Sequence, residues 1–157
     1  RPAMTVAYQL EEAGTRLSRS KIERRPLGPR DVRLDLKFCG ICHSDLVAAS
    51  DKLGGGMFPM VPGHEMVGTV SEMGAEVQGV SVGDTVGVGC IADSCRSCHS
   101  CDTGDEHYCE TGFTLSFNSK DREGHPFHRK SPSPGSSLFL PFISFSQVVP
   151  MLSVLPS

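Results

Sequence analysis

Four of the seven cysteines lie within fifteen residues, in the stretch Cys95-Arg-Ser-Cys98-His-Ser-Cys101 and at Cys109. Two residues between cysteines allow a tight turn to direct both sulfurs at one ion, and structural zinc prefers four such ligands in a tetrahedron. Metal bonds would stabilise residues 90–112, which carry little apolar material, because the free energy of metal binding becomes free energy of folding. The spacing predicts a structural zinc site made by Cys95, Cys98, Cys101 and Cys109.

Disulfides or free surface thiols are the alternative interpretation of this cluster. Three successive cysteines at this spacing cannot all pair, and the total of seven is odd. The N-terminal residues contain no apolar run of signal-peptide length, which predicts a reducing, cytoplasmic location where disulfides are rare. His99 and His107 lie in the same loop and are possible substitute ligands, although we expect both to be solvated.

Composition narrows the class of protein. The formal net charge is −3 and no run of Lys or Arg exceeds Arg24-Arg25, so neither nucleic acid nor an anionic membrane is expected as the main partner. The length of 157 residues suits one domain with a proper core. With 17 glycines, 11 prolines and many short Val/Ile/Leu runs, the chain is typical of a turn-rich, mainly β protein.

Local patterns predict five strands, over 4–10, 16–25, 31–40, 63–74 and 82–90. In the third of these, apolar residues alternate from Val32 to Phe38, which predicts one buried face. A short helix is expected over 43–50, with Ser44 as its N-cap.

Residues 131–157 differ from the rest of the chain, since they contain eight serines, five prolines and no charged residue. A membrane helix over 138–155 is one interpretation, but two internal prolines, a glutamine and three serines disfavour it. A low-complexity tail is the interpretation we prefer.

A second, more widely spaced set of potential metal ligands is informative because of the order of its motifs along the chain. The motifs "CGICHSDL" (39–46), "FPMVPGHEMVGTV" (58–70) and "VGDTVGVGCIADSCRSCHSCDTGDEHYC" (82–109) together resemble the zinc-dependent medium-chain alcohol dehydrogenases. Within that family the chain resembles the NADP-dependent, cinnamyl alcohol dehydrogenase-type branch, from about residue 4 to about residue 124. The resemblance implies a GroES-like β-barrel catalytic domain over 1–124, incomplete, with a zinc-binding lobe at 90–112.

The resemblance also implies roles for individual residues. Cys42 and His64 would bind a catalytic zinc, and Glu65 would be an exchanging or outer ligand. Asp45 would accept the other N–H of His64 and orient its ring. Ser44 would bind the substrate oxygen and begin a proton relay, and His43 would face the cofactor phosphates or take part in proton release. Cys95, Cys98, Cys101 and Cys109 match the structural zinc lobe of the family. Cys39 and Cys90 match neither set, and we expect them to be small buried residues.

What the family requires is only partly present. Its third catalytic ligand is a downstream cysteine, whereas no cysteine follows Cys109 here, and no glycine-rich nucleotide-binding fingerprint of a Rossmann domain follows residue 124. We therefore expect an alcohol dehydrogenase or aldehyde reductase by lineage, acting on small alcohols or aldehydes with NADP(H) and usually homo-oligomeric. The chain as written is expected to be truncated and inactive, with 125–157 an aberrant tail to which no domain is assigned and a barrel that lacks its closing strands.

Two other classes remain open at this point. A non-catalytic β-barrel module with one structural zinc, acting in binding or regulation, is favoured by the missing third ligand. A zinc-free reductase is disfavoured by the Cys42/His64 pair.

Overall fold

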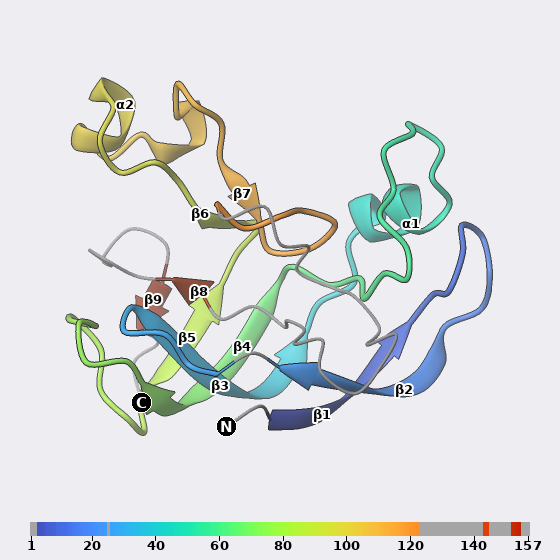
Figure 1. The fold of residues 1–157 in the computed structure, drawn as a ribbon, viewed down its shortest axis with the longest axis horizontal. Coiled ribbons are helices and arrows are strands. Elements are labelled where there is room, and N and C mark those ends of the chain that lie inside the picture. The colour runs from blue at the N-terminus through green and yellow to red at the C-terminus, as the bar shows by residue number, and fades with distance from the viewer. Residues whose placement is uncertain (1–2, 25, 123–142, 145–151, 155–157) are drawn as a thin grey trace.

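The computed structural model describes residues 3–24, 26–122, 143–144 and 152–154. Its centre is a five-stranded sheet in the order β8-β3-β4-β5-β9, drawn in Figure 1 with β3, β4 and β5 side by side. All its neighbouring strands are antiparallel. The bounds are Asp31–Cys39 for β3, Met66–Met73 for β4, Thr85–Val88 for β5, Ile143–Ser144 for β8 and Leu152–Val154 for β9.

The core lies against this sheet and is built from small and medium apolar side chains. Valine dominates because a β-branched side chain suits the pleated surface of a strand. The buried cluster comprises Val32, Met66, Val70, Val80, Val86 and Val88. Its members come from β3, β4, β5 and the loop between the last two, so these strands form one packed unit.

The alternation in β3 holds only for the first half of the strand. Val32 is fully buried and Leu34 is half-buried, but Leu36 is 44% exposed and Phe38 73% exposed. The prediction of one continuous buried face is therefore wrong beyond Leu34. A register shift between Leu36 and Phe38 interrupts the pairing with β4, and a bulge of this kind breaks the strict alternation of faces.

A separate antiparallel hairpin precedes the sheet, with β1 (Ala3–Gln9) paired to β2 (Ser18–Arg24). Ala7, Leu10 and Ile22 are buried. Leu10 exchanges two backbone hydrogen bonds of 2.8 Å with Met60, which is itself fully buried. This bridge fixes the chain just before the "PGHE" segment at residues 62–65.

The remaining elements form a lobe that extends from the sheet at one corner (Figure 1). Its base is a two-stranded pair, β6 (Ile91–Asp93) with β7 (Thr114–Leu115), and between them lie α2 (His99–Asp102) and the 3₁₀ helix η1 (Glu106–Tyr108). These helices have only four and three residues, far too few to be stable alone. The lobe therefore needs another source of order.

Helix α1 (His43–Ala49) lies apart from this lobe, and its N-cap is Cys42 rather than the expected Ser44. The reason is that Asp45, at the third helical position, accepts the backbone N–H of Cys42 at 3.0 Å, which fixes the start of the helix two residues earlier along the chain. Ser44 is thus inside the first turn.

The segment expected as a tail contributes two short strands to the sheet. Strand β8 pairs with Asp31 and Val32 of β3, and β9 pairs with Val86, Gly87 and Val88 of β5. The expectation of a barrel without closing strands, with unpaired edges, is therefore wrong at these residues. Most of 125–157 lies outside the described residues, and so does most of the 138–155 segment weighed as a membrane helix. The parts of that segment that are described, 143–144 and 152–154, are β-strands. Among all the described residues, no helix has the length and apolar character needed to cross a membrane.

Candidate metal centres

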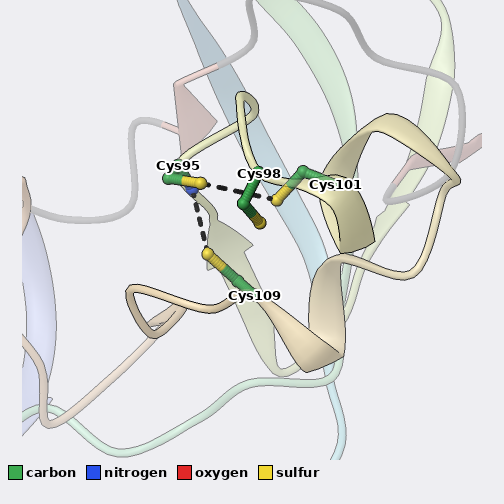
Figure 2. Close-up of side chains that lie close together, drawn as sticks. All are labelled: Cys95, Cys98, Cys101 and Cys109. Atoms are coloured by element: carbon green, nitrogen blue, oxygen red, sulfur yellow. Dashed lines mark hydrogen bonds between the residues drawn. The ribbon is translucent and has the colours of Figure 1, made fainter.

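The four clustered cysteines converge, as Figure 2 shows, although they come from different parts of the lobe. Cys95 follows β6, Cys98 is the N-cap of α2, Cys101 lies in α2, and Cys109 follows η1. All four Sγ atoms lie within 4.8 Å of one another. A bend joins Cys95 to Cys98, and the start of α2 joins Cys98 to Cys101, so the spacing brings the three sulfurs together as predicted.

The separation of the sulfurs fits a tetrahedral ion. Zn–S bonds of about 2.3 Å in a tetrahedron place the sulfurs about 3.8 Å apart, and Cys95 Sγ lies 3.8 Å from Cys101 Sγ. A disulfide would need about 2.05 Å, and all seven cysteines are free. His99 and His107 are exposed and do not belong to the cluster, as expected for solvated side chains.

Local hydrogen bonds favour the thiolate form at part of this cluster. A hydrogen bond from the backbone of Ser97 lowers the pKa of Cys95 to about 5. The backbone N–H of Cys95 in turn donates to Cys109 Sγ at 3.4 Å. Because the thiolate is the form that binds metal, these contacts prepare the cluster for a cation.

The second cluster forms because two strand ends are paired. Cys39, at the end of β3, stands opposite Met66, at the start of β4, and the Gly40 N–H donates to the Glu65 carbonyl at 2.8 Å. The chain between these points leaves the sheet and returns to it, so Cys42 and His64 both lie close to the same strand ends. Donor atoms of Cys42, His64 and Glu65 lie within 4.8 Å of one another.

Asp45 joins the two halves of this cluster. Its side chain, only 6% exposed as a residue, accepts the backbone N–H of Cys42 at 3.0 Å and that of Gly63 at 2.9 Å. It also accepts the Nδ1–H of His64 at 3.0 Å. This contact leaves Nε2 of His64 with the lone pair that a metal requires. The resemblance assigned this orienting role to Asp45, and the contact agrees with it.

Ser44 stands between the two main donors. Its hydroxyl donates to Cys42 Sγ at 3.1 Å and lies 3.2 Å from His64 Nε2. Without a metal, hydrogen bonds from Ser44, and from Nε2–H of His64 when the ring is protonated, lower the pKa of the Cys42 thiol. Burial lowers the pKa of His64, but its hydrogen bonds with Cys42 and Asp45 and their charges outweigh burial, so this pKa is raised overall.

Two glycines make room for this arrangement. Gly63 has φ of 122°, and a Cβ there would lie 2.7 Å from Cys39 Sγ. A Cβ on Gly40 would collide with the carboxylate of Glu65. Glu65 itself is exposed, as is His43 in the first turn of α1.

Phe117 is a site residue that the sequence did not reveal. Its ring stacks on His64 with centroids 4.8 Å apart and an angle of 14° between the planes, and it is 4% exposed. It lies two residues after β7, so its contact with His64 depends on the path of the chain out of the lobe. No spacing or motif in "FTLSFNS" indicates this contact.

The expectation for Cys39 and Cys90 is wrong, since both are exposed. Cys39 is the last residue of β3, and Cys90 lies between β5 and β6, where the backbone N–H of Ser116 donates to its carbonyl. Both stand at strand ends next to the second cluster, away from the valine core, and the short thiol side chain is left uncovered.

An apolar pocket of about 630 Å³ borders the same strand ends. Asp45 and Gly63 contribute to its wall, together with side chains from the β1–β2 hairpin and α1. Its apolar lining includes Leu10, Leu17, Ile41, Leu46, Ala49 and Pro62. Cys42, His64 and Glu65 do not themselves line this pocket, and its wall reaches the cluster through Asp45 and Gly63.

Comparison with known proteins decides the family. Residues 28–126 match the model of the alcohol dehydrogenase GroES-like domain. The chain belongs to the alcohol dehydrogenase family. The expected mainly β, GroES-like fold is thereby confirmed, as is the resemblance from which it was inferred.

The relatives of this alcohol dehydrogenase domain are longer proteins. It is 47% identical over 122 residues to a probable formaldehyde dehydrogenase, AdhA, of Bacillus subtilis (strain 168), and 47% identical over 123 residues to the NADP-dependent alcohol dehydrogenase C 1 of Mycolicibacterium smegmatis. Each match covers 78% of this chain and 35% of the relative. The matched part of the chain thus spans about a third of the length of these curated relatives.

A solved structure agrees with this assignment. The cinnamyl alcohol dehydrogenase SbCAD4 of Sorghum bicolor superposes with a TM-score of 0.79 at 34% identity, over 98% of this chain and 41% of that one. The cinnamyl-type branch inferred from the motifs is therefore found among the structural neighbours.

Proposed function

We propose that this chain is the metal-binding part of a zinc-dependent alcohol dehydrogenase or aldehyde reductase. The main support is the convergence of donor atoms from Cys42, His64 and Glu65. The buried carboxylate of Asp45 orients the His64 ring and also contributes to the wall of the apolar pocket. Sulfur, imidazole and carboxylate donors suit zinc, and three protein ligands leave a fourth position open for substrate. Cys95, Cys98, Cys101 and Cys109 would hold a second, structural zinc.

The chain's own residues have distinct roles in this proposal. Asp45 keeps the Nδ1 proton on His64 and aims Nε2 outward. The Ser44 hydroxyl both donates and accepts, so it can pass a proton away from the oxygen of a bound alcohol. His43, exposed beside it, would receive that proton or contact the cofactor phosphates. Zinc would supply Lewis-acid chemistry at the substrate oxygen, and NADP(H) would exchange the hydride.

The support for NADP(H) and for small alcohol or aldehyde substrates comes from the relatives. The Mycolicibacterium protein is named as NADP-dependent, and the Sorghum structure is named for cinnamyl alcohol. These properties belong to proteins that this chain matches over less than half of their length. Their transfer to the present chain is part of the proposal.

Counting metal on the purified 157-residue protein tests the two sites. We expect two zinc ions per chain. His64→Ala should reduce this number to one, because it removes the imidazole donor, while the fold survives because the valine core lies elsewhere. His99→Ala, which alters an exposed histidine outside both clusters, should keep two. One zinc ion in the unaltered protein would favour the alternative of a non-catalytic module with a structural zinc, which the absence of a cysteine after Cys109 also supports. No bound zinc would contradict both the proposal and this alternative.

We further propose that the 157 residues alone do not transfer hydride. The sequence after residue 124 contains no glycine-rich nucleotide fingerprint, and no cysteine follows Cys109 to supply the thiolate that the family places beside Cys42 and His64 in its catalytic site. Oxidation of NADPH with benzaldehyde or cinnamaldehyde, followed by absorbance, should not exceed the rate without protein. The full-length Mycolicibacterium relative is the positive control. Turnover by the 157-residue chain would contradict this proposal.

A further inference from the structure

The four-cysteine cluster would carry an excess of negative charge with zinc bound. Four thiolates around one Zn²⁺ carry two excess negative charges. The surrounding sequence adds more, because residues 93–122 hold six carboxylates against three Lys or Arg side chains. The six are Asp93, Asp102, Asp105, Glu106, Glu110 and Asp121, and the three are Arg96, Lys120 and Arg122. A cation placed against a ligand sulfur would stabilise such a site.

Arg122 has this placement. Its Nη2 donates to the Gly112 carbonyl at 2.7 Å and lies 3.8 Å from Cys109 Sγ. Its Nη1 donates to the Thr111 hydroxyl at 3.3 Å, and that hydroxyl lies 3.6 Å from the same sulfur. The planar guanidinium therefore spans the turn that follows Cys109, and only a side chain with several donors in a fixed fork can make these contacts together.

The other arginine of the lobe is differently engaged. Arg96 pairs with the Asp93 carboxylate, so its charge is offset by a neighbouring anion. Arg122 also acts electrostatically on Asp93, but its Nη2 is directed at a sulfur and a carbonyl, which places its positive charge beside the cluster. Because Arg122 follows β7, its contacts also join the end of the lobe to the fourth ligand.

We propose that Arg122 is a positioning residue of the structural zinc site. Its side chain holds Cys109 toward the ion, offsets part of the thiolate charge and slows loss of the metal. This inference rests on the structural zinc put forward under the proposed function. It concerns the side chain of this chain and not the family's set of four ligands.

Zinc release tests the proposal. All proteins are the 157-residue chain with Cys42→Ser, so that metal at the second cluster does not interfere. After loading with zinc, release to a chromogenic chelator should be about 10-fold faster in Arg122→Met than in the parent, because loss of an outer contact to a ligand lowers metal affinity by about 10- to 100-fold and we assign this loss to the release rate. Arg122→Lys should fall between them, because it keeps the charge but not the fork. Arg30→Met, at an exposed ion pair with Glu76 elsewhere, should match the parent.

Cobalt spectra separate a role at the sulfur from a merely structural one. With Co²⁺ in place of zinc, removal of a cation and hydrogen-bond donor from Cys109 should move the thiolate-to-metal charge-transfer band to lower energy in Arg122→Met. Thr111→Val, which loses a neutral contact in the same turn, should move it less. Equal release rates and an unmoved band would overturn the inference and leave the zinc site standing. A parent that binds neither metal would overturn both.

Discussion

Cys98→Ser is expected to reduce the zinc content by one ion per chain and to unfold the lobe between β6 and β7, while the five-stranded sheet stays folded. Structural zinc contributes about 10–16 kcal/mol of apparent binding free energy in small domains, and the lobe has little to replace it. Its helices have four and three residues, and Tyr108, its one aromatic residue between Cys95 and Cys109, is 70% exposed.

Limited proteolysis and hydrogen exchange would measure this effect. In Cys98→Ser, amides of residues 93–116 should lose protection, whereas amides of β3, β4 and β5 should keep it, because their core is made of other residues. Cys39→Ser is the matched control, since Cys39 is an exposed thiol outside both clusters. An unchanged zinc count with a protected lobe in Cys98→Ser would show that this cluster does not depend on four thiolates.

The second large effect is expected for Asp45→Ala, which should lower the free energy of unfolding by about 3–5 kcal/mol, even without metal. The substitution leaves three donors without their acceptor, namely the N–H groups of Cys42 and Gly63 and the Nδ1–H of His64. His64 is 4% exposed, so little water can take the place of the carboxylate. The ring would also lose its orientation, so the variant should lose one zinc ion.

Urea unfolding of the metal-free proteins would measure the change in stability, with metal analysis beside it. Asp45→Asn should be intermediate, because its oxygen can serve Gly63 and His64 while its NH₂ group faces the Cys42 N–H. Asp35→Ala, at an exposed position of β3, should stay within about 0.5 kcal/mol of the parent. If Asp45→Ala were as stable as Asp35→Ala, the buried hydrogen bonds of Asp45 would not hold the two segments together.

The lobe and the strands could be predicted from sequence because their determinants are local. Cys95, Cys98 and Cys101 repeat at a spacing with a direct geometric meaning, and the strand predictions for β1 to β5 needed only apolar runs and turns. The second cluster was inferred differently. Cys42 and His64 lie 22 residues apart, and their meeting depends on the pairing of Cys39 with Met66, so only resemblance to a family brought them together.

The features that could not be predicted from the sequence lie mostly at strand and helix ends, where the buried core stops. Phe38 continues an alternating pattern, yet the bulge before it and the end of the valine cluster leave it exposed. The exposure of Cys39 and Cys90 has a similar origin at strand ends. The helix start moved from Ser44 to Cys42 because Asp45 reaches back to the Cys42 N–H, a contact that ordinary N-cap preferences do not include.

The stacking of Phe117 on His64 has a thermodynamic consequence. Phe117 lies two residues after β7, the strand that closes the lobe. Zinc binding by the four cysteines orders this strand and therefore also fixes the ring that stacks on His64. Zinc bound at the four-cysteine cluster should then raise the affinity for zinc at the cluster that contains His64. By thermodynamic linkage, zinc bound at the second cluster must raise the affinity of the first by the same factor. The two centres would fill with positive cooperativity, and a variant that has lost one of them should bind zinc less tightly at the other.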